Sequence, residues 1–193
     1  MYIYLVRHGE TDWNKRRLVQ GRIDLHINEN GIKQAEAMVD LFENMTFEAM
    51  IVSPLKRTLE TAKIISQRAN VKCICEDERI IEKDFGVSEG ILIEERWQKY
   101  PNGHAPNEES FKSVRKRMKE AIMDFSKTYQ NDILVVTHGV ALAALVKELD
   151  QSKKDEYIIM DNVSLTVVNS ESLEIEAFNL VGDNAKKWIK EKN

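Results

Sequence analysis

Short apolar runs alternate with amphipathic segments along most of this chain, and this alternation constrains the fold more than any other sequence feature. Apolar runs as long as buried strands occupy residues 2–7, 48–52, 71–75 and 132–137. Segments with apolar residues at helical spacing occupy 29–44, 54–69, 107–130 and 139–149. Because a helix between two parallel strands covers a face of their sheet, we predict an α/β fold: a three-layer α/β/α sandwich around a mainly parallel, mixed sheet.

Local signals refine this outline. Residues 163–168 and 173–180 are typical of the two strands of a late hairpin, which adds an antiparallel part to the sheet. Asn28 and Asn107 are candidate N-caps for the helices that follow them. Pro54 suits the first turn of the helix between them, because proline lacks the N–H that would be unsatisfied there.

The length and composition predict one domain over residues 1–193. No stretch rich in Pro, Gly or Ser divides the chain, and its 42% apolar residues suffice for one core. The net charge of -4 argues against a general nucleic-acid or membrane-surface binder, which needs a broad positive face. No apolar run approaches the roughly 18 residues of a membrane span, and residues 1–10 do not resemble a signal peptide. We therefore expect a cytoplasmic protein.

Two cysteines, Cys73 and Cys75, are the only ones in the chain. Residues two apart on an extended strand make poor disulfide partners. We interpret them as reduced thiols on a packed strand face, with metal or redox use as the alternative. A reducing compartment fits this interpretation.

Basic residues and histidines stand where three predicted strands end. VRHGET, IVSPLKR and VVTHGV place Arg7, His8, Arg57 and His138 at strand-to-helix boundaries. Ligands bind at the carboxyl ends of the strands in such sheets, so we expect these four side chains to form one cationic pocket. Arginine and helix N-termini both suit phosphate. A metal site is the competing interpretation, but ligand motifs are missing from the sequence and the arginines would repel a cation.

An ordered set of motifs resembles the histidine phosphatase superfamily, the phosphoglycerate mutase-like proteins. The motifs are RHGETDWN (7–14), QGRID (20–24), NGIKQA (30–35), SPLKRTLETA (53–62), IIEKDFGVSEG (80–90), ESFKSVRKR (109–117) and VVTHGVALAALV (135–146). The resemblance implies that His8 is the nucleophile, that Arg7 and Arg57 hold the phosphoryl oxygens, and that His138 completes the pocket. Glu82 falls where the family keeps its proton donor.

The same resemblance suggests substrate-binding residues. Asn14, Gln20 and Gly21 match family positions near the phosphate or the entrance. Arg22 and Lys83, together with Tyr100, are further candidates for contact with the rest of the substrate.

The chemistry of these residue types agrees with the implied roles. A neutral imidazole can attack phosphorus to give a phosphohistidine, which water then opens. Neighbouring cations disfavour the imidazolium and so keep His8 neutral. The arginines and His138 stabilise the charge on the transferred group, so we expect no metal and no cofactor. Glu82 would protonate the leaving alkoxide and later act as base on the water.

Several positions depart from the family pattern. His26 stands where a proline is common, and we interpret it as a surface histidine, with a substrate contact as the alternative. Ser88 replaces a frequent tryptophan, and residues 106–110 read PNEES where many members carry PGGES. These two changes lie in or beside a short covering segment, about 83–110, that we expect to act as a lid. Such a short segment resembles the phosphatase branch.

Three functions remain open at this point. The first is a metal-independent phosphomonoesterase acting on a small phosphorylated metabolite. The second is a phosphoglycerate mutase-type isomerase, which the short lid disfavours. The third is a regulatory protein that dephosphorylates or binds a phosphoprotein. The sequence does not determine the oligomeric state or the substrate, because the variable lid meets the organic part of the ester.

Overall fold

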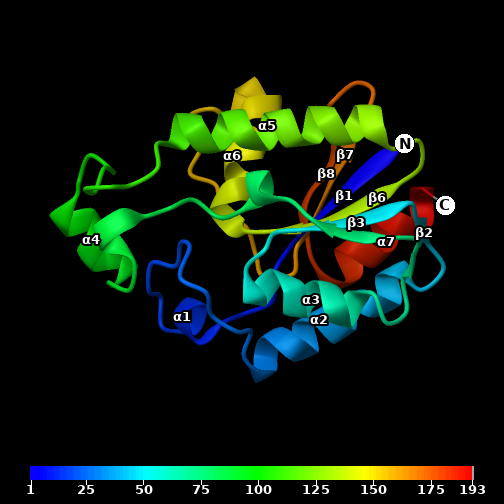
Figure 1. The fold of residues 1–193 in the computed structure, drawn as a ribbon, viewed down its shortest axis with the longest axis horizontal. Helices are drawn as coiled ribbons and strands as arrows, with labels where there is room; N and C mark the ends of the chain where they lie inside the picture. The colour runs from blue at the N-terminus through cyan, green and yellow to red at the C-terminus, as the bar shows by residue number, and fades with distance from the viewer. Residues whose placement is uncertain (193) are drawn as a thin grey trace.

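A computed structural model describes residues 1–192 and contains a six-stranded mixed sheet with the strand order β5-β3-β6-β1-β7-β8 (Figure 1). The strands are β1 (Tyr2–Arg7), β3 (Ala49–Val52), β5 (Ile74–Glu76), β6 (Ile133–Thr137), β7 (Leu165–Asn169) and β8 (Ile175–Leu180). The first four run parallel, and β7 pairs antiparallel with both β1 and β8. The mixed, mainly parallel sheet and the late hairpin are confirmed.

Helices cover both faces of this sheet, as the sequence predicts. One face carries α2 (Glu29–Phe42), α3 (Lys56–Ile65) and α7 (Gly182–Lys192), and the other carries α5 (Phe111–Thr128) and α6 (Gly139–Leu149) (Figure 1). Each layer of helices packs on its own buried apolar cluster. Successive residues of β1 alternate between the clusters, with Ile3 and Leu5 in one and Tyr4 and Val6 in the other. The three-layer arrangement follows from this two-sided burial.

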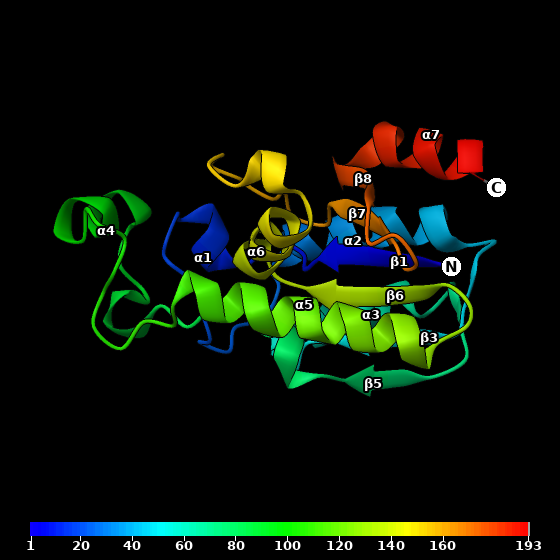
Figure 2. The same cartoon turned by 90° about the horizontal axis from the view of Figure 1, so that it is seen from above.

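Short elements complete the fold. A small parallel pair joins β2 (Thr46–Phe47) to β4 (Asn70–Val71), and single 3₁₀ turns lie at η1 (Glu78–Ile80), η2 (Gly86–Ser88) and η3 (Gln151–Lys153). The helices α1 (Asp12–Lys15) and α4 (Ile93–Lys99) lie beyond the carboxyl ends of the parallel strands, opposite the chain termini (Figure 2). We call residues 83–110, which include α4, the α4 segment.

Two predicted helix starts are wrong. Pro54 precedes α3 rather than entering its first turn, because the helix begins at Lys56 after Leu55. The N-cap of α5 is Ser110, whose hydroxyl accepts a hydrogen bond from the Ser113 N–H, while Asn107 lies earlier with φ 60°. The N-cap at Asn28 is confirmed. The error at α5 arises because the polar run 107–110 offers more than one possible cap, whereas α3 begins after Leu55 with no side-chain cap.

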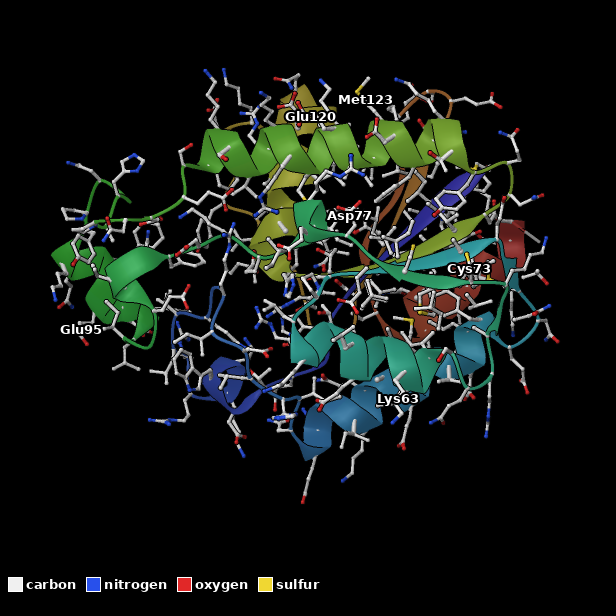
Figure 3. All side chains as sticks on the ribbon, viewed as in Figure 1. Lys63, Cys73, Asp77, Glu95, Glu120 and Met123 are labelled. Carbon is white, nitrogen blue, oxygen red and sulfur yellow. The ribbon has the colours of Figure 1, made fainter. Side chains whose placement is uncertain are left out.

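The run 71–75 also differs from the prediction. It breaks into the end of β4 and the start of β5, with Cys73 between them (Figure 3). Both cysteines are free and exposed, and β5 is an edge strand whose three residues are all exposed. The thiols are therefore unpaired as predicted, but the packed strand face is wrong.

None of the helices within residues 1–192 is long and apolar enough to cross a membrane. The predicted domain range ends at Asn193, which lies outside the described residues.

Candidate active site

The three strand-end motifs meet at one edge of the sheet. His8 follows β1, Ser53 follows β3 and His138 follows β6. Because β6 pairs in parallel with both β1 and β3, their carboxyl ends lie side by side, and Arg7 stands opposite Thr137 in the register. Both histidines are buried.

The His8 ring has a defined orientation and tautomer. Its Nδ1 atom lies 2.7 Å from the carbonyl oxygen of Gly9. A carbonyl oxygen can only accept a hydrogen bond, so Nδ1 carries the proton and Nε2 keeps an unprotonated lone pair. The Nε atom of Arg57 donates toward this Nε2 over 3.3 Å.

His138 mirrors this arrangement from the neighbouring strand. Its Nδ1 atom accepts a hydrogen bond of 3.2 Å from the Nε of Arg57, and its Nε2 lies 2.6 Å from the hydroxyl oxygen of Ser53. The centroids of the two imidazole rings are 5.2 Å apart. One arginine N–H therefore faces one nitrogen of each histidine.

Burial and positive charge hold both imidazoles neutral. Burial lowers the pKa of His8 well below its usual value of 6.5, and the charges of Arg57 and Arg7 lower it further. The pKa of His138 is lowered well below that value too, again by burial first and then by Arg57. A neutral ring is the form that can act as a nucleophile.

Arg57 links the histidines to the loop after α1. Besides its Nε contacts, it donates from Nη2 to the carbonyl of Gly21 over 2.6 Å and from Nη1 to that of Ile23 over 2.9 Å. Burial lowers the pKa of its guanidinium to about 10, which leaves it charged at neutral pH. The loop approaches so closely that a Cβ at Gly21 would clash with a carboxylate oxygen of Glu89 and lie 2.8 Å from the backbone oxygen of Lys83. A side chain at position 21 would therefore force this backbone to shift.

Arg7 brings a second cation to the same place. Its Nη1 donates to the carbonyl oxygen of Met160. Within residues 1–192, its buried Nε atom has no hydrogen-bond partner, and neither has the buried Nε2 of Gln20. Burial lowers the pKa of Arg7, against the opposing charges of Glu82 and Asp161. Two unsatisfied donors at a buried site fit an anionic ligand.

The Glu82 carboxylate caps the first turn of α6. Its oxygens accept hydrogen bonds from the backbone N–H groups of Val140 (3.1 Å), Ala141 (2.9 Å) and Lys83 (2.8 Å). The side chain is 4% exposed. These contacts fix the carboxyl group beside the strand ends, where the helix N-terminus attracts negative charge.

A cavity of about 370 Å³ opens beside this cluster. Predicted site residues Arg7, Asn14, Gln20, Glu82 and Lys83 line it. The buried His8, Arg57 and His138 do not contribute to its lining. The structure thus brings the predicted catalytic residues together and puts a cavity next to them.

The predicted substrate contacts divide into two groups. Asn14 and Gln20 line the cavity and are tied together through Thr11, whose hydroxyl donates to Gln20 over 2.6 Å. In contrast, Arg22 is exposed and forms an ion pair of 3.3 Å with Glu109, outside the cavity lining. Tyr100 and the exposed His26 do not line the cavity either, and His26 is paired with Glu60.

Sequence reasoning missed several supporting residues. Ser53 orients His138, Thr61 accepts a 3.0 Å hydrogen bond from the Gly9 N–H, and Asn162 donates to the His8 carbonyl over 3.2 Å. Ser53 and Thr61 lie inside the SPLKRTLETA motif, which was a usable signal. Asn162 lies in no recognised motif.

Over residues 1–192, we find no cluster of three or more His, Cys, Asp or Glu side chains arranged to hold a metal ion.

The sheet has the architecture of an α/β protein, and its strand-end cluster is a candidate anion site; comparison with known families identifies the class of protein. The model of the histidine phosphatase superfamily (branch 1) matches residues 3–180. The chain therefore belongs to this superfamily, with a phosphoglycerate mutase-like fold.

Named relatives include both phosphatases and a mutase. The chain is 35% identical over 148 residues to PhoE of Bacillus subtilis, named an uncharacterized phosphatase, and 76% of each chain is covered. It is 35% identical over 158 residues to GpmB of Proteus mirabilis, named a probable phosphoglycerate mutase, covering 76% of this chain and 73% of the relative. It is 35% identical over 184 residues to phosphoserine phosphatase 1 of Hydrogenobacter thermophilus, covering 88% and 86%.

A solved structure shows the same architecture. Bacillus stearothermophilus YhfR superposes with a TM-score of 0.83 at 28% identity, over 94% of this chain and 98% of that chain. Together with the phosphatase names above, this similarity supports phosphatase activity.

Proposed function

We propose that this chain is a metal-independent phosphomonoesterase that hydrolyses a small phosphorylated metabolite in the cytoplasm through a phosphohistidine at His8. The observation that carries the proposal is the 2.7 Å contact between Nδ1 of His8 and the Gly9 carbonyl oxygen. The Gly9 carbonyl holds the proton on Nδ1, so the Nε2 lone pair is available beside Arg57. A nucleophile needs this free pair and a nearby base or charge that keeps it free.

In the first step, Nε2 of His8 attacks phosphorus, forming an N–P bond while the ester P–O bond breaks. A bound phosphoryl group puts a second negative charge beside Glu82, so in the substrate complex this carboxyl group, which lines the cavity, would carry a proton and give it to the leaving alkoxide. Arg57 gives up its hydrogen bond to Nε2 as the bond forms. Arg7 and Arg57, with His138 behind them, stabilise the negative charge that spreads over the phosphoryl oxygens.

In the second step, Glu82 takes a proton from water and the resulting hydroxide attacks phosphorus. The N–P bond breaks, phosphate leaves and His8 regains its lone pair. Both protons are accounted for: one passes from Glu82 to the alcohol and one from water back to Glu82. Asn14 and Gln20, which line the cavity, would hold the phosphoryl group through their amides.

The test is phosphate release from a panel of phosphomonoesters in the presence of chelator, with wild type and His8→Ala compared. We expect wild-type release to survive chelation and the variant to lose at least about 10³-fold in kcat. His26→Ala is the matched control, because His26 is exposed and does not line the cavity. An active His8→Ala enzyme, or loss of activity in chelator, would overturn the proposal.

The similarity to a probable phosphoglycerate mutase favours one alternative, transfer of the phosphoryl group back to the product. Interconversion of 2- and 3-phosphoglycerate that outruns phosphate release, after priming with a bisphosphate, would support it. Release from a phosphoprotein but from no small ester would instead support a regulatory phosphatase. Phosphate binding without turnover would support a binding protein.

A further inference from the structure

A buried ion cluster lies in the cavity wall, away from the strand-end histidines. It consists of Lys83, Arg96 and Glu108, whose side chains are 6%, 7% and 4% exposed. Glu108 accepts from the Lys83 ammonium and from Arg96 Nη2, at 2.7 Å to one oxygen and 2.9 Å to the other. Its second oxygen also accepts from the Ala105 N–H over 2.7 Å. Four hydrogen bonds thus occupy this one carboxylate.

The cluster carries fixed charges. Burial acts to raise the pKa of Glu108, but the hydrogen bonds from Lys83, Ala105 and Arg96 outweigh it and lower the pKa. The carboxylate is therefore ionised at neutral pH. It neutralises one of the two cations that the α4 segment brings to the cavity.

Both cations have further contacts within the α4 segment. Arg96 donates from Nη2 to the Gly103 carbonyl over 3.0 Å and from Nε to the Ser88 hydroxyl over 3.3 Å. The ammonium of Lys83 lies 4.3 Å from the centroid of the Phe85 ring. The Nε and Nη2 atoms of Arg96 and the ammonium of Lys83 are therefore held by groups of the cavity wall.

Most other residues around this part of the cavity are apolar. Phe85, Ile93, Trp97, Phe111, Tyr157 and Met160 are among them. The only additional lysine in the lining is Lys147, which is partly exposed and lies 5.7 Å from the centroid of the Phe111 ring. Its charge therefore stays in contact with water.

We propose that Glu108 determines substrate preference: it cancels one of the two positive charges of Lys83 and Arg96 and accepts hydrogen bonds from both, so that the cavity favours phosphomonoesters with an apolar organic part over those that carry a carboxylate. This proposal rests on the proposed phosphatase function. A substrate carboxylate at this wall would have to displace Glu108 or lie beside its negative charge, and both are costly. An apolar group gains free energy from burial against the aromatic and aliphatic lining.

The test compares kcat/KM for naphthyl phosphate and 3-phosphoglycerate in a series that changes the cluster's charge. Glu108→Gln raises the charge of the cluster by one. We expect the ratio of kcat/KM for 3-phosphoglycerate to kcat/KM for naphthyl phosphate to rise by about tenfold or more. Lys83→Met lowers the charge by one and should lower the ratio. The double variant restores the wild-type charge and should return the ratio toward that of wild type.

Glu95→Gln is the matched control. Glu95 is an exposed glutamate on α4 that points away from the molecule and does not line the cavity (Figure 3). Its substitution should leave the ratio unchanged. If Glu108→Gln does not fold, as judged by circular dichroism, the Lys83→Met variant decides, because it keeps the Arg96–Glu108 pair.

The two proposals fail in different ways. If wild type releases no phosphate from either ester, the proposed function fails. If wild type hydrolyses naphthyl phosphate through His8 but prefers 3-phosphoglycerate, the phosphatase stands and the role of Glu108 is refuted. The role of Glu108 is also refuted if Glu108→Gln folds and leaves the ratio of the two kcat/KM values unchanged. If Glu108→Gln does not fold, an unchanged ratio in Lys83→Met refutes that role.

Discussion

The Nε atom of Arg57 lies 3.3 Å from Nε2 of His8, so a buried cation points its N–H at the lone pair of the proposed nucleophile. The contact favours the neutral imidazole, because a protonated ring would face a like charge. It also occupies the lone pair until substrate arrives. Attack on phosphorus therefore requires Arg57 to exchange this hydrogen bond for one to a phosphoryl oxygen.

Replacement of Arg57 by lysine should reduce both activity and stability. An ammonium cannot reproduce the planar set of contacts to His8 and to the carbonyls of Gly21 and Ile23. We expect kcat to fall by about 10²-fold and each buried carbonyl left without a donor to cost about 1–3 kcal/mol. Steady-state kinetics and urea denaturation measure these effects. The control is Arg68→Lys, because Arg68 is exposed and paired with Asp40. This substitution should change neither kcat nor the free energy of unfolding.

The neutral state of His8 predicts its titration. Because burial and then the two arginines lower its pKa, the imidazole should remain unprotonated as the pH falls through 6.5. NMR of ring signals, assigned by their loss in His8→Ala, gives the midpoint directly in the free enzyme. A midpoint at or above 6.5 would contradict the electrostatic account of the site.

The same shifts predict how stability depends on pH. His8 and His138 have folded pKa values below the unfolded value of about 6.5. Their contribution is complete above that pH and is lost as the pH falls toward the folded values, by up to about 1.4 kcal/mol per pH unit for each histidine. The free energy of unfolding, measured in urea from pH 7.5 downward, should therefore decrease. In His138→Gln the slope should be smaller, and equal slopes would refute this linkage.

The proposed role of Glu82 predicts a dependence on the leaving group. Glu82→Gln cannot donate the proton, so hydrolysis of an alkyl phosphate should slow by about 10²-fold or more. A nitrophenyl ester, whose leaving group needs no proton, should lose much less in the first step. Burst kinetics separate that step from hydrolysis of the intermediate. Equal losses of first-step rate for both esters would assign Glu82 to capping α6 alone.

Local sequence determined the layers of the fold and the centre of the site. The period of two in β1 buries residues on both sides of the sheet, and that requires helices on both faces. Because β1 and β6 are parallel neighbours, the motifs that follow them had to bring His8 and His138 to one edge. The strand-end motif after β3 supplied Arg57 as well, and the family resemblance added Glu82.

Tertiary structure decided what surrounds that centre. The tautomer of His8 depends on the direction in which the Gly9 carbonyl points. The orientation of the His138 ring depends on Ser53, which is 85 residues away in the chain. Likewise, the sequence suggested Lys83 as a substrate contact, but in the structure its ammonium donates a hydrogen bond to Glu108, 25 residues further along the chain. Periodicity and capping act within a few residues, whereas these partners meet only when the chain packs. For that reason the sequence determined which groups reach the site, and only the folded structure decided their charge, their hydrogen bonds and the space beside them.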